Sequence, residues 1–172
     1  MKVTTSIATK IVITEADHLD PVTVFIEDYE PGKGKIVIEC YGQSWSAYWG
    51  GMSGCSVSEF FCSCDEHYLA GCLSPRTSAT VFKSEDLRDH AKAEVIRLRR
   101  QREVELVEAR TLYEDADLYL DEVCGNENLL QKIYGDDWYR FLPESPNPDY
   151  AYLCRIINAV KTALRQAEKV AA

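Results

Sequence analysis

The chain lacks the features that would place it in a membrane or direct it to secretion. No apolar run approaches the roughly 20 residues that a membrane-spanning helix requires. Residues 1–20 contain Thr, Ser and Lys throughout, so they lack the unbroken apolar core of a signal peptide. We therefore expect a cytoplasmic protein with no membrane partner.

The chain also lacks the short motifs that commonly identify enzymes. GxGxxG, the P-loop, HExxH and GxSxG are all absent, which excludes the nucleotide-binding, zinc-protease and hydrolase classes that these motifs define. The acidic residues lack the alternate spacing and central glycine of a calcium loop. We expect a protein that is not an enzyme and that has no cofactor.

Positive charge is the scarce sign in this chain. The 28 Asp and Glu residues outnumber the 19 Lys and Arg residues, and the net charge is -9. Because affinity for nucleic acid comes from neutralising phosphates with cations, direct nucleic-acid binding is not expected. The acidic balance indicates either ordinary solubility or a surface that competes for another protein's nucleic-acid site, and the first is more common.

Cysteine, by contrast, is plentiful. The chain has 172 residues, which is enough to bury a core without disulfides or structural metal. Its seven cysteines are an odd number, so disulfide formation would leave at least one thiol unpaired. In a reducing compartment the default is free, buried thiols that act as small hydrophobic residues.

The first part of the chain alternates apolar and polar residues in the way that strands do. The predicted strands occupy residues 2–15, 22–29, 35–42 and 44–49. The glycines of Glu30–Gly34 supply the positive φ angles that a hairpin connection needs. These features predict an antiparallel meander of three or four strands, with one face covered by helices.

Helical periodicity follows the strands. A capping box at Ser56–Glu59 begins a helix that is predicted over residues 57–71. A second start at Ser84–Asp86 opens a helical pattern that continues to about Val123. Because no Gly or Pro interrupts residues 85–123, we favour one long helix over a helical hairpin broken near Arg110–Thr111.

Two further helices complete the prediction, at residues 126–134 and 148–170. The fold class is therefore α+β: an N-terminal three- to four-stranded antiparallel meander followed by a mostly helical C-terminal half with one long helix. The composition changes near Pro75, and we interpret residues 1–75 and 76–172 as the β-rich and helical halves of one domain. The apolar stripe of the long helix is a possible homodimer surface.

Cysteine and histidine cluster between the strands and the long helix. The spacing does not match the usual zinc knuckles, and on a helix Cys62 and Cys64 would lie about 200° apart. Cys64, His67 and Cys72 could share a face and are weak candidates for zinc ligands, but packed thiols are the favoured interpretation. A nucleophilic Cys64–His67 pair is disfavoured, because the neighbouring acids would raise the pKa of the thiol.

Two charged runs are candidate partner-binding surfaces. Arg99 and Arg100 belong to a basic run that could bind carboxylates or phosphates bidentately, although acids nearby on the helix could pair with them instead. The acidic run could imitate the phosphate spacing of a nucleic acid, although a solvated helix face is the more common interpretation. Its candidate residues are Glu114, Asp115, Asp117 and Asp121.

Aromatic residues provide a third candidate surface. Trp45 and Trp49 stand beside Gly50 and Gly51 and could form a platform for a base, a sugar or a partner protein. Aromatic residues in a strand next to a helix are more often part of the core, and this is the favoured interpretation.

The segment AYWGGMSGCSVSEFFCSCDEHYLAGCLSP, Ala47–Pro75, resembles a segment of accessory proteins of temperate (lambdoid) phages and prophages of enteric bacteria. The resemblance extends over about Val12–Pro75, and its motif has no known chemistry attached, so no residue role is carried over. Such proteins are similar in size and acidity to phage factors that disable host defence, including anti-CRISPR-like proteins.

The resemblance implies a non-enzymatic phage protein in the host cytoplasm that binds and inhibits or modulates a host or phage protein complex. Nucleic-acid-handling or CRISPR-type defence machinery would be a natural target. The alternative is a structural or zinc-stabilised phage accessory protein without an inhibitory role.

Overall fold

The computed structural model describes residues 1–171, and within the last helix the side chains of residues 168, 170 and 171 are not described. The chain forms two compact units: Met1–Ala79 together with Asn147–Ala172, which we call the sheet unit, and Thr80–Pro146, which we call the hairpin unit. The α+β fold class is confirmed. The last helix belongs with the strands rather than with the other helices of the second half, and the expectation of a single domain stays a prediction.

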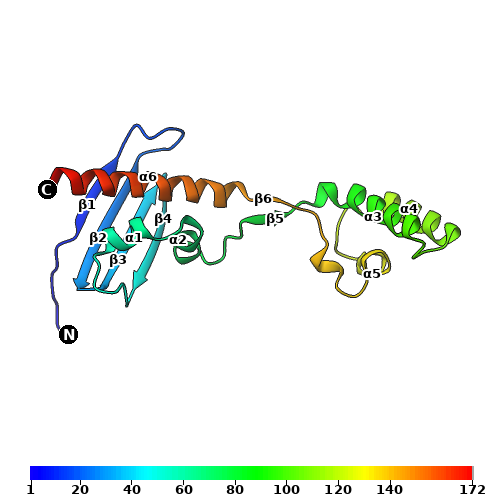
Figure 1. Cartoon of the computed structure of the whole chain (residues 1–172), viewed down its shortest axis with the longest axis horizontal. Coiled ribbons are helices and arrows are strands. Elements are labelled where there is room, and N and C mark those ends of the chain that lie inside the picture. Colours follow the sequence, from blue (N-terminus) through cyan, green and yellow to red (C-terminus); the bar gives the residue numbers. More distant parts are fainter. Residues whose placement is uncertain (172) are drawn as a thin grey trace. The chain divides into compact units, whose positions relative to one another are not determined.

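The sheet unit contains the predicted antiparallel meander, with four strands in the order β1-β2-β3-β4 (Figure 1). The strands are β1 (Thr9–Ile13), β2 (Val22–Glu30), β3 (Lys33–Cys40) and β4 (Gln43–Trp49). Alternate residues of β2 and β3 are buried, as the period of two predicts. Val24 pairs with Ile38, and Ile36 pairs with Ala47, so the apolar residues of three strands form one continuous face.

The first strand is shorter than predicted. Residues 2–15 were expected to be extended, but the ladder with β2 begins only at the pair Thr9–Ile26. Beyond Ile26, the pairing of β2 with β3 shifts between Asp28 and Glu30, which marks a bulge at this end of the sheet. Val3 and Ile7 are exposed, so no burial holds the first eight residues on the sheet.

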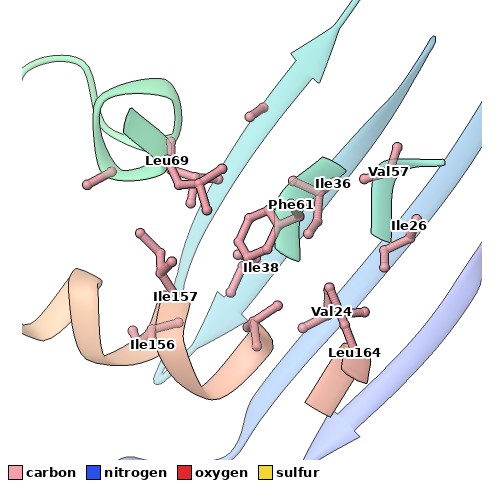
Figure 2. Packing of buried hydrophobic residues seen from close by; sticks show 14 of the residues in the cluster. Val24, Ile26, Ile36, Ile38, Val57, Phe61, Leu69, Ile156, Ile157 and Leu164 are labelled. Carbon is pink, nitrogen blue, oxygen red and sulfur yellow. The ribbon is translucent and has the colours of Figure 1, made fainter. Parts of the chain in front are cut away.

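Three helices cover the apolar face of this sheet: α1 (Val57–Ser63), α2 (Glu66–Leu73) and α6 (Pro148–Ala171). Figure 2 shows Phe61 of α1 beside Ile36 and Ile38. A side chain of this size contributes about 1.5–3 kcal/mol when it is fully buried. Gly34 lets α1 approach the sheet closely, because a Cβ there would meet the Glu27 carbonyl oxygen at 2.6 Å and the Val57 side chain.

The helix predicted over residues 57–71 is two helices. Its capping box is confirmed, since Glu59 N donates to Ser56 Oγ and the Glu59 carboxylate accepts from Ser56 N. However, α1 ends at Ser63, Cys64 is extended, and the Asp65 side chain accepts from His67 N to cap α2. The break occurs because the Asp65 side chain caps the start of a new helix. Asp is more favourable at an N-cap than in the interior of a helix.

The hairpin unit consists of α3 (Leu87–Gln101), α4 (Leu106–Tyr119) and α5 (Glu127–Tyr134) with two short strands, β5 (Thr80–Phe82) and β6 (Glu144–Pro146), which pair antiparallel. Short 3-10 turns at Ser84–Asp86 and Trp138–Arg140 complete it. Its core is formed by all three helices and is rich in Ala and Leu. The buried residues are Leu87, Ala91, Val95, Ala109, Leu112, Ala116, Leu120, Leu130 and Ile133.

The favoured single helix over residues 85–123 is wrong, and the hairpin alternative breaks at a different place from the one considered. The break lies at Arg102, which has φ 62° and a left-handed conformation. Glu103 N donates to Leu98 O at 3.0 Å and Arg102 N donates to Arg99 O at 3.2 Å, the two bonds of a Schellman motif. A non-glycine residue in the left-handed conformation costs about 1–2 kcal/mol. The burial of Leu112 and its neighbours against α3 stabilises the fold by more than this cost.

The helix that was expected to form a homodimer surface therefore does not exist as one element. The apolar stripes of α3 and α4 pack against each other within the same chain, and the longest helix is α6. A homodimer stays a prediction, without the surface proposed for it.

Candidate protein-docking groove

The hairpin unit presents an open, mainly apolar groove between α3 and α4, with a volume of about 370 Å³. Val95 and Ala109 form its buried floor, while Ile96, Leu106 and Tyr113 stand at its walls and remain substantially exposed. Leu106 is 61% exposed, although it is the first residue of a helix whose other face packs into the core. Exposed apolar residues that gather in one concave place mark interaction sites more often than isolated ones do.

Arginines surround this apolar floor. Arg99, Arg100 and Arg110 line the groove, and Glu114 is the acidic residue among its lining. Arg99 donates to the Val104 carbonyl oxygen at 3.4 Å. Within the part of the chain that the structure describes, neither Arg100 nor Arg110 has a carboxylate at ion-pair distance. The groove therefore offers an apolar surface with an excess of unneutralised cations.

Arg97, another member of the basic run, behaves as the intramolecular interpretation predicted. Arg97 pairs with Glu94, with Nη2 at 2.6 Å from Oε1 and Nε at 2.8 Å from Oε2, and it also donates to Gln101. The pairing holds Arg97 along its own helix. Arg99 and Arg100, the two residues predicted to bind a partner, are instead the ones that lie at the groove.

The four acidic candidates have different surroundings in the structure. Lys92 donates to Asp117 at 2.7 Å and Arg88 donates to Asp121, so both acids tie α4 and its C-terminal end to α3. The hydrogen bond from Lys92 holds the pKa of Asp117 below its ordinary value. Asp115 is half-buried, and Glu114 lies at the groove. Partner binding through these acids stays a prediction, but two of them already have an intramolecular partner.

The proposed aromatic platform does not form, because Trp49 is buried. Its ring packs edge-on against Phe60 and Phe61, with centroids 5.4 Å and 6.3 Å away. Trp45 is half-buried and lines a pocket of about 510 Å³ in the sheet unit, together with Tyr152. The core interpretation is therefore correct for Trp49, since alternation along β4 directs Trp45, Ala47 and Trp49 to the same covered face.

The weak zinc trio of Cys64, His67 and Cys72 does not assemble among the described residues. Cys64 and Cys72 pack against the core of the sheet unit, and burial raises the pKa of the Cys64 thiol. A reactive thiol requires the opposite shift, so a Cys64 nucleophile remains disfavoured. His67 belongs to α2 and turns away toward Tyr150, with Nδ1 2.8 Å from the Tyr150 hydroxyl oxygen.

Sequence reasoning missed the groove because it depends on the helix break. Leu106, Ala109 and Tyr113 meet Val95 and Ile96 only when the chain reverses between α3 and α4. One signal in the sequence could have indicated the break: Arg102 occupies a position in the otherwise apolar stripe that a continuous helix would have buried.

Comparison with known proteins places the chain among phage proteins: a model described as a phage family matches residues 1–166. The chain belongs to this phage family. The phage origin expected from the resemblance is confirmed at this level, and the lambdoid and enteric source stays a prediction. Neither curated proteins nor solved structures gave a match. In the described part of the chain, no helix has both the length and the apolar character needed to cross a membrane.

Proposed function

We propose that this phage protein acts without catalysis, by binding a protein complex of the host or the phage through the groove between α3 and α4. The observation that carries the proposal is the combination of exposed apolar walls, formed by Ile96, Leu106 and Tyr113, with Arg100 and Arg110, which have no acidic partner in the described structure. A chain with net charge -9 has ample acid to neutralise these arginines, yet the fold leaves them free at an apolar surface.

Charge complementarity defines the partner. The groove fits a segment that inserts one or two apolar side chains and carries Asp or Glu beside them, because arginine recognises carboxylates through a rigid, bidentate fork. Protein interfaces in general have the same composition, with an apolar or aromatic centre and polar residues at the rim. An acidic, amphipathic segment of a partner protein is therefore the expected occupant.

A narrower form of the proposal is inhibition of a complex that handles nucleic acid, such as CRISPR-type defence machinery. The net charge of -9 supports this form, because an acidic protein can occupy a basic nucleic-acid site. The ion pairs of Asp117 and Asp121 weaken that support, since each pair neutralises one negative charge. The groove supports the general proposal that the protein binds a partner protein. The class of that partner is tested separately.

The groove can first be tested with a small probe, 1-anilinonaphthalene-8-sulfonate, which combines apolar rings with one negative charge. We expect the double variant Arg100→Glu/Arg110→Glu to bind the dye about tenfold more weakly, because it replaces two favourable charge contacts of roughly 0.5–1 kcal/mol each by repulsive ones. Lys132→Glu is the matched control, since Lys132 is an exposed cation of α5 outside the groove. Equal weakening in both variants would contradict a specific cationic groove.

The function itself is tested by affinity capture from a bacterial host, followed by binding measurements with the purified partner. The expected partner is retained by the parent protein and by Lys132→Glu, and it is lost by Arg100→Glu/Arg110→Glu with an unchanged melting temperature. A partner retained by the double variant, but lost when Asp115, Asp117 and Asp121 are all changed to Lys, would move the interface to the acidic run. Displacement of bound nucleic acid from the purified complex would support the narrower form, and unaltered nucleic-acid binding would contradict it.

A further inference from the structure

A second cluster of chemically active side chains lies in the sheet unit, remote in sequence from the groove. It joins Glu66 and His67 of α2 to Cys154 of α6, and one ligand atom from each residue lies within 4.8 Å of the other two. The donors are a carboxylate oxygen, an imidazole nitrogen and a sulfur. Sequence spacing gave no sign of this cluster, because Cys154 is far along the chain from α2.

The core of the sheet unit holds these two helices in place. Leu69 and Ala70 of α2 and Leu153, Ile156 and Ile157 of α6 are all buried in one apolar cluster. Cys154 directly follows Leu153, and His67 precedes Leu69 by two positions, so the cluster sits at the rim of that packed contact. The relative placement of the three donors is therefore determined by core packing rather than by a loop.

Hydrogen bonds engage one polar atom of His67 and one of Glu66 outside the cluster, and the second polar atom of each residue remains close to the other. Nδ1 of His67 is 2.8 Å from the Tyr150 hydroxyl oxygen, and the two rings stack with centroids 5.9 Å apart. In the tautomer that donates from Nδ1, Nε2 keeps its lone pair, and this atom lies 4.0 Å from Glu66 Oε1. The other carboxylate oxygen, Glu66 Oε2, accepts from Asn158 Nδ2 at 2.5 Å. Such outer contacts are typical of metal ligands.

The local charge favours a cation. The carboxylates of Asp65 and Glu66 act electrostatically on Cys154, so negative charge gathers near the three donors. The nearby cations point elsewhere: Arg155 lies over the Tyr152 ring at 5.3 Å, and Lys161 donates to the Cys64 carbonyl oxygen. A divalent ion that binds at Cys154 would displace the thiol proton, because the ion is attracted more strongly to the thiolate than to the neutral thiol.

We propose that Glu66, His67 and Cys154 bind one divalent ion of the zinc class. Sulfur and imidazole nitrogen are ligands for borderline ions such as Zn²⁺ and Co²⁺, whereas Mg²⁺ and Ca²⁺ select oxygen ligands. In a tetrahedral site, metal–ligand bonds of about 2.0–2.3 Å place the donors roughly 3.3–3.8 Å apart, so side-chain adjustments on the order of an ångström complete the site.

The site has three protein ligands and leaves a fourth position toward solvent, since the His67 side chain is 66% exposed. Water or a side chain of a bound partner can fill this position. The ion would link α2 to α6 and stabilise the sheet unit. The inference does not depend on the proposed docking groove, because all of its residues belong to the sheet unit.

The experiment loads the full chain, purified in the reduced and metal-free state, with Zn²⁺ and, separately, with Co²⁺. We expect one ion per chain by equilibrium dialysis, a rise in melting temperature with added Zn²⁺, and a thiolate-to-cobalt charge-transfer band in the near ultraviolet. Cys154→Ser should abolish the band, and His67→Gln should weaken binding at least tenfold. Unchanged melting of both metal-free variants would show that they remain folded.

Two matched variants make the result decisive. Cys72→Ser changes a half-buried thiol of the same helix α2 outside the cluster, and Cys124→Ser changes an exposed thiol of the hairpin unit. Both should keep the stoichiometric ion and the cobalt band. Tyr150→Phe removes the hydrogen bond to His67 and should weaken the affinity about 10–100-fold while the band is retained.

Three results would overturn the inference. One is the absence of a stoichiometric ion in the parent protein, and another is a cobalt band that survives Cys154→Ser. The third is loss of the band in Cys72→Ser, which would assign the ion to a different set of thiols.

Discussion

The two units of this protein differ in how much of their apolar surface they bury. In the sheet unit, three helices close over one face of a four-stranded sheet, and its core contains large side chains such as Phe61, Met52 and Ile156. In the hairpin unit, the core is smaller and depends on alanines, while Leu106, Val107 and Leu118 of α4 stay mostly exposed. A unit that leaves large apolar residues in solvent is better suited to binding than one that buries them.

The difference also separates the two proposals. The sheet unit supplies a rigid frame on which Glu66, His67 and Cys154 can be held at fixed positions, as a metal site requires. The hairpin unit supplies an open groove in which apolar side chains and arginines remain available to another protein. The following variants test this contrast, from the largest expected effect to the smallest.

The closed core of the sheet unit is tested by Phe61→Ala. Phe61 is fully buried and touches the apolar faces of the sheet and of Trp49, so its loss should lower the free energy of unfolding by about 3–5 kcal/mol. Phe60→Ala is the control on the same helix. Because Phe60 is only half-buried, this substitution should lower the free energy of unfolding by clearly less. Chemical denaturation measures both. Equal costs would mean that the core is not as closed as described.

The close approach of α1 to the sheet is tested by Gly34→Ala. The added Cβ would lie 2.6 Å from the Glu27 carbonyl oxygen and would overlap the Val57 side chain, so we expect destabilisation of about 1–3 kcal/mol. Gly71→Ala in α2 is the matched substitution, since no atom lies within 4 Å of its Cβ position. It should instead stabilise the helix by about 0.5–1 kcal/mol. Thermal or chemical unfolding distinguishes the opposite signs.

The reversal that creates the groove is tested by Arg102→Gly. Glycine adopts the left-handed conformation of Arg102 without steric cost, so the variant should unfold with a free energy up to about 1 kcal/mol higher. Ala93→Gly, at an exposed position inside α3, should lower that free energy by about 0.5–1 kcal/mol. Destabilisation by Arg102→Gly would argue against the left-handed end of α3.

The ion pair between α3 and α4 is expected to have the smallest effect. Lys92 lowers the pKa of Asp117 in the folded state. The contribution of the ion pair to the free energy of unfolding is therefore fully present above the ordinary carboxyl pKa of about 3.9, and it is lost as the pH falls through the lower folded-state pKa. Asp117→Asn should therefore flatten the fall in unfolding free energy between about pH 5 and pH 2. Asp115→Asn serves as the control, because Asp115 is a neighbouring acid that forms no ion pair in the described structure. An unchanged pH profile in Asp117→Asn would show that the pair is not formed in solution.

Local patterns predicted much of the fold. The period-two alternation of β2 and β3 located the sheet, and the Ser56–Glu59 capping box located the start of α1. Arg99, Arg100 and Glu114 were chosen for their charge, and the structure brings these three together at one groove. Trp49 was a candidate for a binding surface on its residue type, but the core was the favoured interpretation, and its position on the covered face of β4 does bury it.

The errors in the helices concern helix ends that contain no glycine or proline. Asp65 ends one predicted helix because its side chain can cap the next, and Arg102 ends another because two amphipathic helices gain more by packing together than by continuing. Residues near these ends have ordinary helical propensities. The choice therefore depends on burial that only distant residues supply.

The sequence by itself determined which residues face a core, where most elements begin, and that the chain is an acidic α+β protein, because periodicity, capping and composition are local properties. The tertiary structure alone decided where α3 turns back, which arginines remain unpaired, and that Cys154 meets Glu66 and His67. These outcomes depend on contacts between segments that are far apart in the chain. Packing selects such contacts through the total surface that they bury.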